Sequence, residues 1–170
     1  MRVQGLEQRQ QIYEHILHFP GSHFREMQRH LKLPVGTLQY HLRNLSEDGL
    51  IIQKKDGEYV RYYAIGLFTE REKKLLSLLR QKPIRHITLL LLTHKELNHK
   101  RIVSELKLSP ATTSWYLDKM LESRVVKKRR KGKEVIYSLT KPDELAKVII
   151  TYRSSFLDEI VDRFIEMWER

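Results

Sequence analysis

Residues 20–45 read PGSHFREMQRHLKLPVGTLQYHLRNL, and this stretch decides the fold. Apolar side chains recur at helical spacing both before and after the short segment Lys32–Pro34. Proline suits the first position of a new helix, because its missing N–H is not needed there. The pattern predicts a short helix, a tight turn and a second helix that runs to about Asp48. The inward side chains of that second helix are Leu38, Leu42 and Leu45.

The flanking residues complete the unit. Gln8 to His18 carries apolar residues at helical spacing, and Phe19-Pro20-Gly21 ends that helix. After the second helix, Leu50 to Tyr63 alternates in the manner of two strands around the turn signal Asp56-Gly57. The predicted order of helix, helix, turn, helix and two-stranded hairpin is a winged helix-turn-helix.

The unit occurs twice. Residues 12–65 align without a gap onto residues 87–140 when the sequence is shifted by 75 positions. Leu31-Lys32-Leu33 then falls on Leu106-Lys107-Leu108, and Gly57 falls on Gly132. Two copies are too few for a solenoid. The sequence therefore predicts two winged helix-turn-helix domains in tandem, a mainly α fold with small β-hairpin wings.

Two further helices are predicted outside the repeats. Thr69 to Glu72 forms a capping box that opens a connecting helix. Residues 143–169 follow the periodicity of one long amphipathic helix. The expected organisation is a first winged-helix domain (1–67), a connecting helix (68–82), a second winged-helix domain (83–141) and a C-terminal helix (142–170).

Charge points to an anionic partner. The chain has 170 residues, a net charge of +11 and no cysteine. Residues 142–170 carry −3, so that residues 1–141 carry +14. Nucleic acid is the commonest large anion that such a basic protein binds. The longest apolar run, Ile87–Leu92, is far shorter than the roughly 20 residues that span a bilayer. We therefore expect a soluble cytoplasmic, nucleoid-associated protein with no membrane partner.

The second helix of a helix-turn-helix presents its outward side chains to the base edges of the major groove. In the first copy Gln39 can pair with adenine and Arg43 with guanine or a phosphate, whereas His41 is expected at the edge of the core. In the second copy Asp118 replaces Arg43, so base reading there is less favoured. The candidate contacts are Val35, Gly36, Thr37, Gln39, Tyr40 and Arg43 in the first copy, and Ser109, Thr112, Ser114 and Trp115 in the second.

The two wings differ in charge. The first offers Lys54, Lys55 and Arg61, which Asp56 and Glu58 offset. The second has seven basic residues among the ten from Arg124 to Lys133 and is expected to hold phosphates or enter the minor groove. Its candidate contacts are Lys127, Lys128, Arg129, Arg130, Lys131 and Lys133.

The C-terminal helix is expected to form a homodimer. One long helix of roughly 27 residues measures about 40 Å, more than one winged-helix domain can cover. Dimeric regulators read paired half-sites in this way. The alternative is that the helix packs back on both domains. The expected dimer seam is Phe156, Ile160, Phe164 and Trp168.

Enzymatic and metal motifs are missing from the sequence. It contains no glycine-rich phosphate loop, no His-Glu-x-x-His and no serine nucleophile elbow. The eight histidines are scattered, without an i, i+4 pair on one helix face. We expect a protein that is not an enzyme and has no catalytic residue, no metal and no cofactor.

Residues 20–45 resemble the first domain of archaeal winged-helix transcription regulators. Those proteins share the Pro-Gly-x-His-Phe-Arg-Glu opening and the Gly-Thr-x-Gln-Tyr-His-Leu recognition helix, and many carry two such domains in tandem. One tandem group with this layout comprises the euryarchaeal archaellum regulators, which are activators. The second copy departs from the motif, with Ser114-Trp115-Tyr116 in place of Gln-Tyr-His. The resemblance implies double-stranded DNA binding near promoters.

The sequence thus predicts a sequence-specific transcription regulator, an activator or a repressor. An activator could recruit a basal transcription factor through Trp115 and its neighbours. Two alternatives remain open at this point: an architectural chromatin protein that binds DNA without sequence preference, and a tandem winged-helix scaffold of the transcription or replication machinery. RNA is a further possible ligand.

Overall fold

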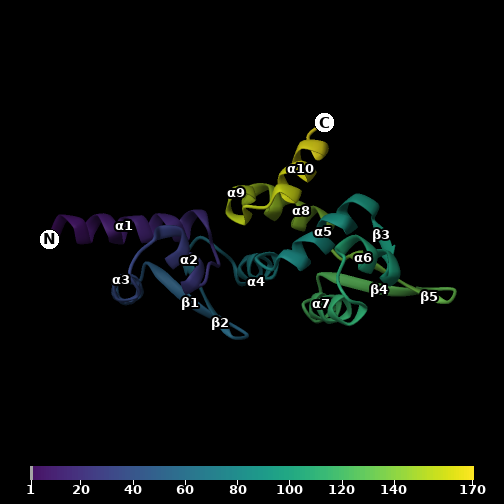
Figure 1. Ribbon diagram of the computed structural model, residues 1–170, viewed down its shortest axis with the longest axis horizontal. Coiled ribbons are helices and arrows are strands. Elements are labelled where there is room, and N and C mark those ends of the chain that lie inside the picture. Colours follow the sequence, from purple (N-terminus) through teal and green to yellow (C-terminus); the bar gives the residue numbers. More distant parts are fainter. Residues whose placement is uncertain (1) are drawn as a thin grey trace. The chain divides into compact units, whose positions relative to one another are not determined.

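Two compact units make up the chain in the computed structural model, which describes residues 2–170. Unit 1 contains the residues up to 77 together with 154–156, and unit 2 contains residues 78–153 and 157–170. Figure 1 shows the order of the elements along the chain.

Unit 1 consists of three helices, a hairpin and a fourth helix that continues into unit 2. The turn between the second and third helices is made by Lys32, whose φ of 54° is left-handed and whose N–H donates to the carbonyl of Gln28. The elements are α1 (Arg2–His18), α2 (Phe24–Leu31), α3 (Val35–Glu47), β1 (Ile51–Asp56), β2 (Tyr59–Ala64) and α4 (Glu70–Leu79).

The core of unit 1 comes from the apolar stripes of its helices and the base of the hairpin. These side chains leave the opposite face of α3 in solvent, which fixes how that helix is presented. The buried cluster contains Ile12, Ile16, Met27, Leu38, Leu42, Leu45, Ile51 and Tyr62.

Unit 2 has a related element order and one additional strand. Its elements are α5 (Lys82–His94), β3 (Glu96–Asn98), α6 (His99–Leu106), α7 (Pro110–Glu122), β4 (Val126–Lys131), β5 (Glu134–Leu139), α8 (Pro142–Thr151) and α10 (Glu159–Trp168), whereas three of the four residues of α9 (Arg153–Phe156) belong to unit 1. The bounds of α6, α7, β4 and β5 lie 75 positions after those of α2, α3, β1 and β2. The sheet has the antiparallel order β3-β5-β4. In unit 1 a single bridge between His23 and Arg61 stands where β3 pairs with β5.

The C-terminal segment corrects one sequence expectation. The predicted long helix over residues 142–170 is wrong, because the segment is divided into the three helices α8, α9 and α10. Leu157 has a left-handed φ of 49°, and the side chain of Asp158 accepts a hydrogen bond from the Ile160 N–H at the start of α10. An aspartate in this capping position favours a new helix start over continuation of the old helix.

Asp158 also fixes the position of the break between α9 and α10. Its buried carboxylate accepts hydrogen bonds from Nε and Nη2 of Arg85 at 3.1 and 3.0 Å, and it lies 3.2 Å from Nε2 of His86. Arg85 also donates to the carbonyls of Leu79 and Arg80, just where α4 ends. One guanidinium therefore joins the end of α4 to the start of α10.

The break also divides the predicted dimer seam. Phe156 and Phe164 are buried within the chain, whereas Ile160 and Trp168 are 38% and 50% exposed. Four residues that a continuous helix would present on one stripe therefore do not share one exposed surface. No helix of the described residues is long and apolar enough to cross a membrane.

Candidate nucleic-acid interface

Helix α3 presents polar side chains to solvent along one face. Leu38, Leu42 and Leu45 point into the core, as predicted, and leave Gln39 and Arg43 exposed. Tyr40 is 61% exposed and Val35 46%, while Thr37 is half-buried. His41 is buried, as expected for a histidine at the core edge. Burial, and then the charge of Arg9, lower its pKa.

The start of α3 is open. No side chain caps its first turn, because Pro34 stands at the N-cap position. Gly36 follows, and nothing lies within 4 Å of the position that a Cβ would take there. Backbone without a side chain allows another molecule to approach closely. Helix N-termini of this kind suit a phosphate group.

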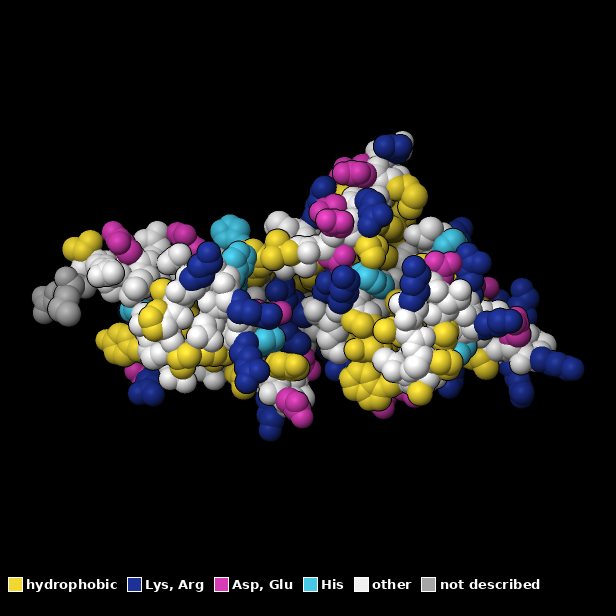
Figure 2. Space-filling model, viewed as in Figure 1, with side chains coloured by type: hydrophobic (Ala, Val, Ile, Leu, Met, Phe, Trp, Pro, Cys, Tyr) yellow, Lys and Arg dark blue, Asp and Glu magenta, His cyan; other side chains and the backbone are white. Residues whose placement is uncertain are grey.

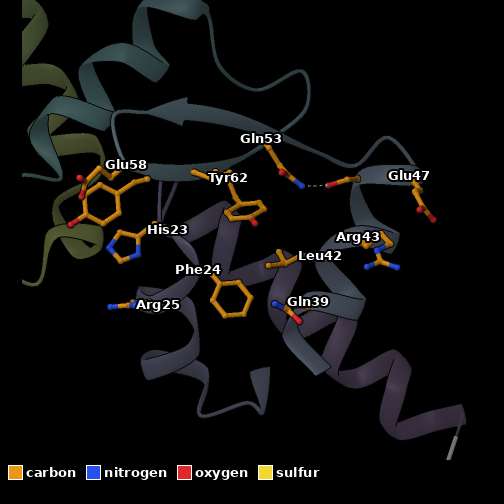
Figure 3. Close-up of a pocket in the computed structure, with 13 residues that line it drawn as sticks. His23, Phe24, Arg25, Gln39, Leu42, Arg43, Glu47, Gln53, Glu58 and Tyr62 are labelled. Atoms are coloured by element: carbon orange, nitrogen blue, oxygen red, sulfur yellow. Dashed lines mark hydrogen bonds between the residues drawn. The ribbon is translucent and has the colours of Figure 1, made fainter. Parts of the chain in front are cut away.

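A groove lies between α2, α3 and the hairpin (Figure 3). Its apolar floor is formed by Phe24, Leu42 and Tyr62. The polar side chains around the floor are His23, Arg25, Gln39, Arg43, Glu47, Gln53 and Glu58. The structure thus brings Gln39 and Arg43 of the predicted set together with side chains from two other elements.

The sequence analysis did not predict that α2 and one face of the β1–β2 hairpin also contribute side chains to the groove. His23 stacks on Tyr59 of β2 with ring centroids 4.7 Å apart, and Arg25 lies beside it in the first turn of α2. The position of Gln53 on this face could have been predicted from the sequence, because the side chains of a strand alternate between its two faces. Gln53 and Lys55 therefore share the face that borders the groove, and Lys54 belongs to the other.

The first wing requires a correction. Arg61 was predicted to contact DNA, but it is 3% exposed. Its Nε donates to Asp56 Oδ2 at 2.7 Å and its Nη1 to the Gly21 carbonyl at 3.0 Å. A guanidinium held in this way supports the hairpin and has no free surface for a phosphate.

Lys54 is also engaged. It forms an ion pair with Glu70 of α4, which Lys73 also contacts. The hydrogen bonds from Lys54 and Lys73 lower the pKa of Glu70 to about 2. Of the three residues predicted for this wing, Lys55 is exposed.

Helix α7 occupies the position that α3 has in unit 1, but its start is closed. Ser109 accepts a hydrogen bond from the Thr112 N–H at 3.1 Å, and the two hydroxyls lie 2.7 Å apart. The Ser114 hydroxyl lies 2.9 Å from His99 Nε2. Three of the four side chains predicted to contact DNA in this copy thus have hydrogen bonds within the protein.

Trp115 is the fourth predicted residue, and it is 57% exposed. The Lys119 ammonium lies 5.5 Å from its ring centroid. Further along the helix, burial and then the charge of Asp118 raise the pKa of Tyr137, so the carboxylate lies near the sheet. The outward face of α7 therefore carries Trp115, Lys119 and Asp118, where that of α3 carries Gln39 and Arg43.

The second wing is a basic projection. All six predicted residues are exposed, and Figure 2 shows Lys and Arg side chains gathered at this hairpin. Strand alternation places Lys128 and Arg130 on one face, and Lys127, Arg129 and Lys131 on the other. Arg129 is partly engaged, since its Nη2 lies 2.8 Å from Glu96 Oε2. That hydrogen bond lowers the pKa of Glu96 and raises the pKa of Arg129.

Comparison with known proteins finds a family match within the first unit. Residues 6–76 match the family model HTH_HVO_0163_N, an N-terminal HTH domain. The chain is also 33% identical over 129 residues to MJ1398 of Methanocaldococcus jannaschii, described as an uncharacterized HTH-type transcriptional regulator. The match covers 76% of this chain and 32% of MJ1398, so the chain spans about a third of that relative.

Two solved structures are similar to part of this chain. The transcriptional repressor PagR of Bacillus anthracis is 32% identical, with a TM-score of 0.43 over 48% of this chain and 93% of PagR. HlyU from Vibrio cholerae is 24% identical, with a TM-score of 0.44 over 49% of this chain and 89% of HlyU. The matching family and the archaeal relative are both described as helix-turn-helix proteins, and neither description is that of an enzyme. Among the described residues, no group of three His, Cys, Asp or Glu side chains could hold a metal ion.

Proposed function

We propose that this protein is a sequence-specific regulator that binds double-stranded DNA at promoters. The observation that carries the proposal is the exposed pair Gln39 and Arg43 on α3 of an HTH domain. Both side chains can form bidentate hydrogen bonds, Gln39 with adenine and Arg43 with guanine. An architectural protein that ignores sequence needs no such side chains.

In this proposal the two units have different roles in DNA binding. They are tandem winged helix-turn-helix domains, of which the first reads bases and the second holds the phosphate backbone. The open start of α3 and the groove beside it support the first role. The exposed cations of the second wing support the other, because phosphate contacts supply sequence-independent affinity.

The regulator acts as a homodimer in the cytoplasm, associated with the nucleoid. Paired copies would read a site with two-fold symmetry. The exposed Trp115, together with Asp118 at the position that Arg43 has in α3, forms a surface that suits a protein such as a basal transcription factor better than it suits DNA. That surface is the observation that favours the second candidate function, a protein-interaction scaffold.

Selection of genomic fragments tests the proposal. The purified protein is mixed with fragmented genomic DNA at about 150 mM salt, where non-specific binding is weakened, and the retained DNA is sequenced. Enrichment of a few promoter fragments that share a two-fold symmetric motif is the expected result. Uniform recovery of the genome would instead identify an architectural protein, and no recovery would favour the scaffold. Competition with duplex RNA of the same sequence separates DNA binding from RNA binding.

A further inference from the structure

Strand β3 brings a carboxylate to one basic face of the second wing. Glu96, its first residue, lies opposite Ser138 of β5, and Ser138 in turn lies opposite Lys127 of β4. Side chains at directly opposed positions of an antiparallel pair lie on the same face of the sheet. Alternation along β4 adds Arg129 and Lys131 to that face. Glu96 therefore shares one face of the hairpin with three of its cations.

Arg129 is held by this carboxylate through two hydrogen bonds. Its Nε donates to Oε1 of Glu96 at 3.2 Å, and its Nη2 donates to Oε2 at 2.8 Å. A guanidinium uses the same fork of two N–H groups to bind a phosphate. The donors that Arg129 would use in a contact with the DNA backbone are therefore occupied within the protein.

The surroundings of the pair keep the carboxylate charged. The hydrogen bond from Arg129 lowers the pKa of Glu96, and the positive charges of Lys131 and Lys127 lower it further. The ionised carboxylate binds the guanidinium and also repels a phosphate that approaches it. The Arg129 and Glu96 side chains are 53% and 43% exposed, so that a phosphate can reach the guanidinium once the carboxylate is removed.

The first unit builds the same kind of hairpin without a carboxylate at the corresponding position. Gly21 stands 75 positions before Glu96, and the hairpin of β1 and β2 forms beside it. The cation that corresponds to Arg129 is Lys54, whose partner Glu70 comes from α4 and not from a neighbouring strand. A carboxylate at the position of Glu96 is thus not a requirement of the hairpin itself.

We propose that Glu96 withholds Arg129 from the DNA backbone and thereby limits the affinity of the second wing for phosphate. Arg129 stays paired with Glu96 when DNA is bound, and the other cations of the wing make the contacts. Glu96 is a positioning residue, since it acts through Arg129 and does not itself touch DNA. Because phosphate contacts carry no sequence information, the restraint lowers the affinity for all duplexes alike. The inference rests on the proposed binding of DNA, and a second polyanion in its test separates the two.

The first test measures the affinity of the full chain for a duplex of arbitrary sequence, by fluorescence anisotropy over a series of salt concentrations. Glu96→Gln is expected to bind several-fold more tightly than the parent at low salt. The slope of log K against log salt is expected to steepen by about 0.9, since one phosphate contact is added. A carboxylate that merely braces the hairpin predicts the opposite sign, because its loss would weaken binding. Weaker or unchanged binding would overturn the proposal.

Glu105→Gln is the matched control. It removes the same charge from unit 2 and likewise releases an arginine from an exposed ion pair, the one with Arg101 at 2.9 Å on α6. Its slope is expected to stay that of the parent. An equal gain in both variants would attribute the effect to net charge and would also overturn the proposal. Circular dichroism establishes that each variant is folded.

A double-mutant cycle assigns the effect to Arg129. In the parent, Arg129→Gln is expected to leave the slope nearly unchanged, because the guanidinium is withheld from phosphate. In the Glu96→Gln background the same substitution is expected to remove both the gained affinity and the gained slope. A decrease of about 0.9 in the slope when Arg129 is replaced in the parent would show that Arg129 already contacts phosphate, which would contradict the proposal.

Heparin, a sulfated polyanion without base pairs, separates the failure of this inference from the failure of the proposed function. On a heparin column Glu96→Gln is expected to elute at higher salt than both the parent and Glu105→Gln. If no variant binds duplex DNA, the proposed function fails, while later elution of Glu96→Gln supports the withholding of Arg129 from a polyanion. Equal elution of the three chains would overturn the inference as well.

Discussion

Two arginines show how far single residues can be assigned from the sequence. Arg43 was predicted to point outward because Leu38, Leu42 and Leu45 fix the inward face of α3, and it is exposed. Arg61 was assigned to the wing surface because it lies in the hairpin, yet it is buried. A strand pattern cannot show that Asp56 and the Gly21 carbonyl converge on one guanidinium, because that contact joins positions 40 residues apart.

Arg43→Ala is expected to lower the affinity for the selected site by about 1–3 kcal/mol and to relax specificity at one base pair. The reason is the loss of a bidentate contact to a base edge. Fluorescence anisotropy with the selected duplex and single-base variants measures the effect. Lys74→Ala, an exposed change outside the groove, is the control. Equal losses on every duplex would mean that Arg43 only holds a phosphate.

Arg61→Ala is expected to destabilise the protein by about 3 kcal/mol, because it leaves Asp56 without its buried partner. Urea denaturation measures the change. Lys55→Ala, an exposed change on the same hairpin, is expected to stay within about 0.5 kcal/mol of the parent. If Arg61→Ala were fully stable and instead lost affinity for DNA, Arg61 would return to the interface.

At the level of elements, periodicity located the helices and strands of both units but missed where the C-terminal helix ends. Apolar residues at helical spacing continue through residues 143–169, so the pattern predicts one helix. The break depends on Asp158, whose carboxylate is held by Arg85, 73 residues earlier. The strand β3 was missed for a similar reason, since only pairing with β5 defines its three residues.

Leu157→Gly tests the strain at this break. Leu157 has a φ of 49° and is 76% exposed, so glycine relieves the left-handed conformation and loses little burial. A gain of about 0.5–1 kcal/mol in the free energy of unfolding is expected by urea denaturation. Leu157→Ala keeps the unfavourable φ and should bring no gain. A loss of stability in the glycine variant would show that the Leu157 side chain is needed.

Neutralising the second wing should change the salt dependence of binding and not its specificity. In the triple variant with Gln at 127, 128 and 131, the slope of log K against log salt is expected to fall by about 2–3, since each lost phosphate contact removes about 0.9. A second triple variant, with Gln at the exposed positions 74, 82 and 147, is the control with the same net charge. An unchanged slope in the wing variant would exclude the wing from the interface.

The whole molecule combines two units with related elements and different surfaces. Helices α6 and α7 and strands β4 and β5 of unit 2 lie 75 positions after their counterparts in unit 1. The spacing of hydrophobic residues predicts the element order that the two units share, because the positions that point into the core must be apolar in both units. The surface positions follow no such rule: Arg43 corresponds to Asp118, and Gln53 to Lys128. The groove of unit 1 could therefore not be predicted in full, since it needs α2, α3 and the hairpin in place together.

Both units are expected to lose stability in mild acid. Burial lowers the pKa of His41 in unit 1 and of His86 in unit 2. With folded pKa values below the usual value of about 6.5, the unfolded chain binds more protons as the pH falls through that value. Their stabilisation is thus complete above this pH and is lost below it. Urea denaturation at pH 7.5, 6.5 and 5.5 measures the decline, and His41→Phe should flatten it for unit 1. A pH-independent stability would contradict this prediction.

The closed start of α7 has a consequence for protein engineering. Transferring the outward side chains of α3 to α7 would carry over the hydrogen-bonding groups for bases but not the place where a phosphate anchors the helix. Ser109 already occupies the Thr112 amide, whereas the corresponding turn of α3 has no side-chain acceptor. A graft meant to give the second unit a new target would therefore have to begin at residue 109 and include a proline there, so that the helix start is transplanted with its side chains.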